Sequence, residues 1–226
     1  MKKFFVIMGL PRSGTTALRT ALCEHSKMHT TYELFNEAYN ENLPFTLKEV
    51  KNLFNSLYAH KKPIVGVHQN FDCPRFHHRK YVWDRLIDMS GNLIVVDRPN
   101  HLDRFISYVF AKSFNHWHEW REGEEDHNPD KALAPDEIEI DLDKFDKFCI
   151  NQNEQREKMF EQAEAFKKHI VINYDDLNAF IGREIKKCLT FLDVPFERIV
   201  PKTKKFQRHT KITNLEEAKT IALNHQ

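Results

Sequence analysis

Four short apolar runs recur along the chain, each bounded by polar residues, glycine or proline. They cover residues 4–8, 64–67, 93–96 and 170–172. Runs of this length that are rich in β-branched residues are typical of strands buried on both faces of a parallel sheet. We therefore predict a sheet built from these four strands.

Between the apolar runs, hydrophobic residues recur with helical spacing. The predicted helical stripes lie at 17–22, 50–57, 82–87, 102–110 and 181–192. Thr46 and Glu49 form a capping box before the second stripe, and Gly91 ends the third. This alternation predicts a doubly wound α/β fold with a mostly parallel sheet flanked by helices.

A chain of 226 residues holds one α/β domain with a substantial core, so we predict a single domain over 1–226. Residues 119–141 are acidic and poor in large apolar side chains, which predicts a surface loop or lid. Residues 198–213 are basic, with no acidic residue between 198 and 211. This segment is either a solvated tail or a strap that folds over a ligand crevice.

A formal net charge of +1 gives no global attraction to nucleic acid, and we expect no nucleic-acid partner. The apolar run near the N-terminus is too short for a signal peptide. No later stretch approaches the roughly 20 apolar residues that cross a bilayer. We therefore expect the protein to be cytoplasmic and to have no membrane partner.

The cysteine and histidine patterns do not predict a metal site. The four cysteines contain no C-x-x-C pair, which argues against a zinc site or a disulfide framework: Cys23, Cys73, Cys149 and Cys188. The clusters at 77–78 and 116–118 lack further ligands at defined spacing. We expect no bound metal and reduced, mostly buried thiols.

The segment from Gly9 to Thr16, Gly-Leu-Pro-Arg-Ser-Gly-Thr-Thr, links the first predicted strand to the first helix. Backbone N–H groups in such a loop and helix start favour an anion. Arg12 and the hydroxyls of Ser13, Thr15 and Thr16 add donors. The spacing resembles a P-loop, but Thr15 stands where the lysine of nucleoside triphosphatases belongs.

Arg98 lies just after the third predicted strand, separated from it by Asp97, and Ser107 lies in the helix that follows. Both can bind a phosphate group, although an ordinary ion pair is the alternative for Arg98. Ligands of open α/β sheets sit beyond the carboxyl ends of the strands, where the glycine loop, Arg98 and the basic segment would converge.

Taken in order, these motifs resemble the sulfotransferase family that uses 3′-phosphoadenosine 5′-phosphosulfate (PAPS). Residues 11–16 resemble its 5′-phosphosulfate loop, and Arg98 with Ser107 resembles its 3′-phosphate site. Downstream, three segments match the family's Y-E-D-L, F-L-G-V-P and basic loop: 171–177, 191–195 and 205–214. The resemblance implies PAPS contacts from Arg12, Ser13, Gly14, Thr15, Thr16, Arg98, Ser107, Lys205, Arg208 and Lys211.

Glu33 resembles the catalytic glutamate of tyrosylprotein and bacterial-type sulfotransferases, with Glu37 as the alternative. His68 stands where many members carry a lysine that contacts the sulfuryl group. It can be a base, an acceptor-binding donor or a structural residue. The interval from Arg98 to Ser107 is one residue longer than the common family pattern, which leaves Arg104 as another phosphate partner.

The resemblance implies transfer of the PAPS sulfuryl group to a hydroxyl, or to an amine, of a small-molecule, carbohydrate or peptide acceptor. A sulfuryl group carries less negative charge than a phosphoryl group, so arginine and backbone donors suffice without a metal. The alternatives are a P-loop kinase and a catalytically degenerate nucleotide-binding protein. The sequence predicts neither the acceptor nor the oligomeric state.

Overall fold

The computed structural model describes residues 2–35, 46–72, 78–113, 137–199 and 211–225. They group into two compact units. Unit 1 comprises Met1–Asp97 and Lys158–Pro201, and unit 2 comprises Arg98–Glu157 and Lys202–Gln226. The division falls within one long helix, α5 (Leu142–Glu164).

Unit 1 is built on a five-stranded sheet in the order β2-β3-β1-β4-β6, with every neighbouring pair parallel. Its strands are β1 (Lys3–Gly9), β2 (Met28–Glu33), β3 (Ile64–Asn70), β4 (Asn92–Asp97) and β6 (Lys168–Asn173). The four predicted strands are confirmed. The fifth, β2, is an edge strand of sequence Met-His-Thr-Thr-Tyr-Glu and lacks the apolar run that a central strand requires.

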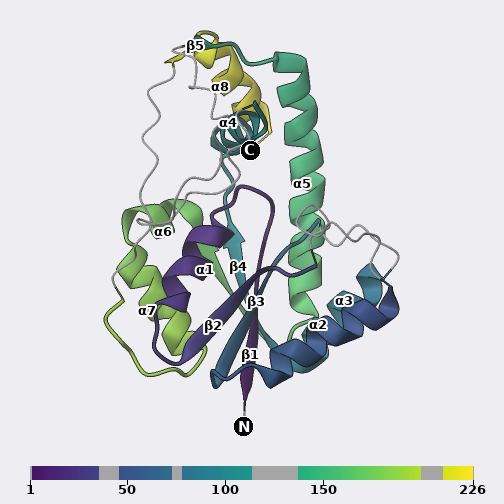
Figure 1. Cartoon of the computed structure of the whole chain (residues 1–226). Helices are drawn as coiled ribbons and strands as arrows, with labels where there is room; N and C mark the ends of the chain where they lie inside the picture. The colour runs from purple at the N-terminus through teal and green to yellow at the C-terminus, as the bar shows by residue number, and fades with distance from the viewer. Residues whose placement is uncertain (1, 36–45, 73–77, 114–136, 200–210, 226) are drawn as a thin grey trace, which may run out of the picture. The chain divides into compact units, whose positions relative to one another are not determined.

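Helices cover both faces of this sheet, as predicted for a doubly wound fold (Figure 1). One face carries α1 (Thr15–Cys23), α6 (Tyr174–Ala179) and α7 (Ile181–Phe191). The other carries α2 (Leu47–Ala59), α3 (Arg79–Ser90) and the final residues of α5. Strand β1 serves both faces, because Phe5 and Ile7 pack in one apolar cluster while Val6 and Met8 pack in the other.

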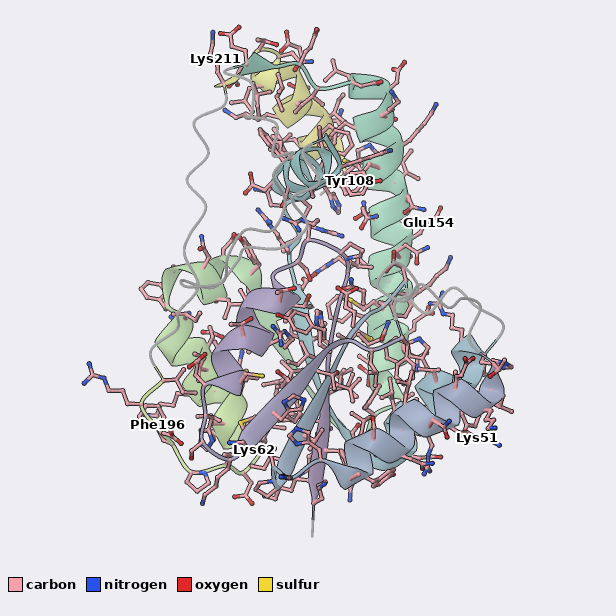
Figure 2. All side chains as sticks on the ribbon, viewed as in Figure 1. Lys51, Lys62, Tyr108, Glu154, Phe196 and Lys211 are labelled. Carbon is pink, nitrogen blue, oxygen red and sulfur yellow. The ribbon has the colours of Figure 1, made fainter. Side chains whose placement is uncertain are left out.

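Local signals fix two of the helix ends. The capping box before α2 is present: the Glu49 backbone N–H donates to Thr46 Oγ1 at 3.3 Å, and the Thr46 N–H donates to the Glu49 carboxylate at 2.7 Å. Helix α2 buries Phe54, whereas Lys51 is exposed on its outer surface (Figure 2). Gly91 ends α3 with φ +62°, a conformation that favours glycine.

Unit 2 contains α4 (His101–Ser113), most of α5, α8 (Leu215–Asn224) and a short parallel pair of β5 (Glu137–Ile138) with β7 (Lys211–Ile212). Its apolar cluster includes Phe105, Phe145 and Ala218. Helix α5 was not predicted, because its buried side chains are spread thinly through a polar sequence.

Two predicted segments are only partly described. Of the loop at 119–141, residues 119–136 lie outside the described residues, and 137–138 form β5. Of the basic segment at 198–213, residues 200–210 lie outside them, and 211–212 form β7. The prediction of one domain over 1–226 stays a prediction.

Cys149 and Cys188 are free, buried thiols; burial raises the pKa of Cys149 to about 11 and that of Cys188 to about 12. They are therefore unreactive as nucleophiles near neutral pH. Cys23 is half-buried, and Cys73 lies outside the described residues. None of the described helices has the length and apolar character of a membrane span.

Candidate functional site

The glycine loop begins at the end of β1, and β1 lies between β3 and β4 in the sheet. Gly9 pairs in register with Asn70 of β3 and with Val96 of β4. A Cβ atom at Gly9 would overlap the Ser13 and Thr15 side chains. The loop therefore folds tightly back over the strand end, and this approach requires glycine.

Two residues of the loop have left-handed backbone conformations. Gly14 is the N-cap of α1 with φ +93°, and a Cβ atom there would overlap the Tyr174 ring. Arg12 has φ +66°, which costs a residue other than glycine roughly 1–2 kcal/mol. Strained backbone of this kind persists mainly at functional sites, and alternating backbone handedness turns N–H groups toward one point.

The start of α1 fits an anion. It has no side-chain cap and no acidic residue in its first turn, so its terminal N–H groups are left for an external acceptor. Ser13 is 1% exposed, and its Oγ has no hydrogen-bond partner among the described residues. A phosphate or sulfonate oxygen would satisfy these donors, so the residues present fit the predicted anionic ligand.

A buried carboxylate, Glu33, lies at the carboxyl end of β2. It is 7% exposed, and its Oε1 accepts a 2.7 Å hydrogen bond from Asn70 Nδ2. His68 Nε2 lies 4.0 Å from the same oxygen. The β2–β3 register shifts between Thr30 and Glu33, and such an irregularity redirects the side chains that follow it.

The structure corrects one boundary next to this carboxylate. The apolar run predicted the second strand over residues 64–67, but β3 continues to Asn70. His68 is 1% exposed and lies within the sheet. The polar residues Gln69 and Asn70 interrupt the apolar pattern that predicted the strand, although both are buried. Glu37, the alternative base, lies outside the described residues.

The predicted 3′-phosphate residues belong to unit 2. Arg98 follows β4 directly, and its Nη2 lies 3.5 Å from Asp103 Oδ2, so the ion pair considered as its alternative role is present. Ser107 and Arg104 are buried on α4, where Arg104 also donates to Gln152.

The basic segment is described only at its end. Lys211 is exposed in β7 and lies 2.8 Å from the Glu137 carboxylate. Lys205 and Arg208 lie outside the described residues. The structure thus brings the glycine loop, Glu33 and His68 together in unit 1, and groups Arg98, Arg104 and Ser107 in unit 2.

Two residues of unit 1 make contacts in the site that the sequence pattern did not predict. Asn70 contacts Glu33, and Tyr174 packs against Gly14. Tyr174 lies in the segment that resembles Y-E-D-L, while Asn70 follows a predicted strand by three residues; both positions mark strand ends. Among the residues that the structure describes, no group of three histidine, cysteine, aspartate or glutamate side chains could hold a metal.

The parallel sheet, with an anion loop between its first strand and the following helix, defines a P-loop-like α/β fold. A family model described as the sulfotransferase domain matches residues 2–226. The chain belongs to the sulfotransferase family.

Individual relatives agree with this assignment. Nodulation protein H of Rhizobium tropici is 26% identical over 201 residues, which cover 86% of this chain and 77% of that protein. A sulfotransferase from Alicyclobacillus acidocaldarius has a similar fold, with a TM-score of 0.54, 15% identity and coverage of 100% of this chain and 93% of its own. A mouse sulfotransferase complexed with PAP also has a similar fold, with a TM-score of 0.52 and 12% identity. The match covers 100% of this chain and 64% of the mouse chain.

Proposed function

We propose that this protein transfers the sulfuryl group of PAPS to a hydroxyl acceptor. The observation that carries the proposal is a glycine loop whose buried Ser13 hydroxyl has no partner in the described part of the chain, in the same unit as the buried carboxylate Glu33. The PAP bound to the mouse sulfotransferase, the desulfated product of PAPS, supports the choice of donor.

In this proposal the loop residues of unit 1 bind the donor and Glu33 acts as the base. Arg12 and the N–H groups of the loop and of α1 bind the 5′-phosphosulfate, helped by Ser13, Thr15 and Thr16. Glu33 accepts the proton of the acceptor hydroxyl. The new oxygen–sulfur bond forms as the bond between sulfur and the bridging phosphate oxygen breaks, and PAP leaves with the electron pair.

Further residues bind the rest of the donor or support the base. The 3′-phosphoadenosine part contacts Arg98, Ser107, Lys205, Arg208 and Lys211. His68 supports Glu33, because its imidazole lies 4.0 Å from the carboxylate and needs only a small approach to donate a hydrogen bond. No metal takes part, since arginine and backbone donors neutralise the charge that develops on PAP. The acceptor is a small molecule, a carbohydrate or a peptide.

Two variants separate donor binding from proton transfer. In Arg12→Ala we expect the thermal stabilisation by PAP to shrink, and PAPS-dependent sulfate transfer to fall by about 100-fold or more. Glu33→Gln should keep the PAP stabilisation and lose transfer by about 10²- to 10⁴-fold. Arg85→Ala, the same change on α3, is the matched control.

The assay uses labelled PAPS with a panel of phenol, sugar and tyrosine-peptide acceptors. Unchanged turnover in Arg12→Ala would contradict the proposal. Stabilisation by PAP with no transfer to any acceptor would favour the degenerate nucleotide-binding protein. Stabilisation by ATP above that by PAP, with magnesium-stimulated ATP hydrolysis, would favour the kinase.

A further inference from the structure

Asn70 is one of the described residues that contact the carboxylate of Glu33; His68, at 4.0 Å, is another. The two side chains are 8% and 7% exposed, and the Nδ2-to-Oε1 distance is 2.7 Å, which is typical of a hydrogen bond to a charged acceptor. The amide presents its NH₂ group to Glu33 and donates to the carboxylate oxygen. This bond favours the ionised form of the carboxylate, the form that accepts a proton.

The backbone of Asn70 is fixed against the start of the anion loop. Asn70 pairs in register with Gly9, and the next residue, Phe71, donates its N–H to the Gly9 carbonyl at 2.9 Å. One residue of β3 therefore contacts β1 where the loop begins, and β2 where the carboxylate lies. The main chain of Asn70 is held against β1, and its side chain contacts Glu33 at the end of β2.

We propose that Asn70 is a positioning residue that fixes the Glu33 carboxylate, in orientation and in charge, relative to the anion loop. This inference rests on the proposed function, in which Glu33 is the base and the loop binds the group to be transferred. Asn70 acts through Glu33, and its own contact is with that carboxylate and not with the reacting atoms. Displacing a base by about 1 Å is enough to cost about 100-fold in rate.

The test compares Asn70→Ala and Asn70→Asp with the wild type. Asn70→Asp keeps the side-chain volume and loses the donor when it is ionised. We expect kcat to fall by about 10- to 100-fold in both, with KM for PAPS nearly unchanged. The acid limb of the kcat profile should move to higher pH by about one to two units, because the donor to the charged form is gone.

Asn92→Ala is the matched control. Asn92 lies at the opposite, amino end of β4, and its Nδ2 donates to the Ser90 carbonyl at 3.3 Å. This variant loses a comparable amide contact on the same sheet, yet both kcat and the pH profile should remain those of the wild type.

A second readout separates failure of this inference from failure of the proposed function. The side-chain carboxyl carbon of Glu33 is titrated by ¹³C NMR in the wild type and in Asn70→Ala. If the wild type transfers sulfate, an unchanged kcat and pH profile in Asn70→Ala overturns the positioning role. If the wild type transfers no sulfate, a higher Glu33 midpoint in Asn70→Ala still supports Asn70 as the group that holds this carboxylate, and an unchanged midpoint overturns it.

Discussion

Arg12 and Gly14 both have left-handed backbone conformations within the same short loop, for different reasons. Gly14 pays no steric penalty at φ +93°, and its missing side chain leaves room for the Tyr174 ring. Arg12 bears the strain of φ +66° with a full side chain. The loop therefore keeps a conformation that costs backbone strain at Arg12, and we proposed that this conformation binds an anion.

Replacing Gly14 by alanine tests this conformation. Gly14→Ala should lower the free energy of unfolding by about 1–3 kcal/mol, because the new Cβ overlaps Tyr174 and the residue keeps a left-handed φ. Urea denaturation measures the change, and stabilisation by PAP should be reduced in the same variant.

Gly182→Ala is its control. Gly182 lies near the start of α7, where a Cβ atom would meet nothing within 4 Å. Alanine there should leave stability unchanged or raise it by up to about 1 kcal/mol. Equal losses in the two variants would show that the Gly14 conformation is not special.

At the scale of helices and strands, the sequence predicted those elements whose signals are local. Thr46 and Glu49 predicted the start of α2, because a capping box involves only residues three apart. The central strands followed from apolar runs. The edge strand β2 was missed, since its partner β3 lies far along the chain and its own residues are polar.

The capping box gives a prediction at this scale. Thr46→Ala should lower the free energy of unfolding by about 1 kcal/mol, because the Glu49 backbone N–H loses its acceptor. Ser56→Ala on the same helix is the control: Ser56 is exposed and donates only to the Leu53 carbonyl, and alanine has the higher helix propensity. Because alanine raises helix propensity, a loss in Thr46→Ala that is absent from Ser56→Ala assigns the effect to capping, and a similar loss in both variants, measured by urea denaturation, would contradict that assignment.

On the scale of the whole molecule, the family match runs across both units, while the described residues form two apolar clusters in unit 1 and one in unit 2. The residues predicted to contact PAPS are also divided between the two units. The 5′-phosphosulfate loop is in unit 1, and Arg98 with Ser107 is in unit 2.

The stability of the whole molecule should depend on pH through histidines whose pKa is lowered. The pKa of His29 is lowered, chiefly by burial and also by the positive charges of His60, Arg19 and Lys62. The unfolded chain therefore takes up the proton first as pH falls below the ordinary value near 6.5. Stability is fully present above that pH and is lost as pH falls through the folded pKa.

We expect the urea midpoint at pH 5.5 to lie below that at pH 7.5, and His29→Gln should reduce this difference. His101 acts with the same sign, because burial is the largest cause that lowers its pKa. A midpoint that rises on acidification, or a His29→Gln variant with an unchanged pH slope, would contradict the assignment.

The glycine loop, four of the five strands of the main sheet and the family could be predicted from the amino-acid sequence, because these depend on residue types at fixed short spacing. Arg12, Gly14 and Glu33 were identified as candidates from such patterns. Tertiary structure alone decided that β3 extends to Asn70, that Asn70 contacts Glu33, and that Tyr174 packs on Gly14. The two side-chain contacts join residues that are at least 37 positions apart. They form because strand pairing brings distant segments together, and no local sequence pattern encodes that pairing.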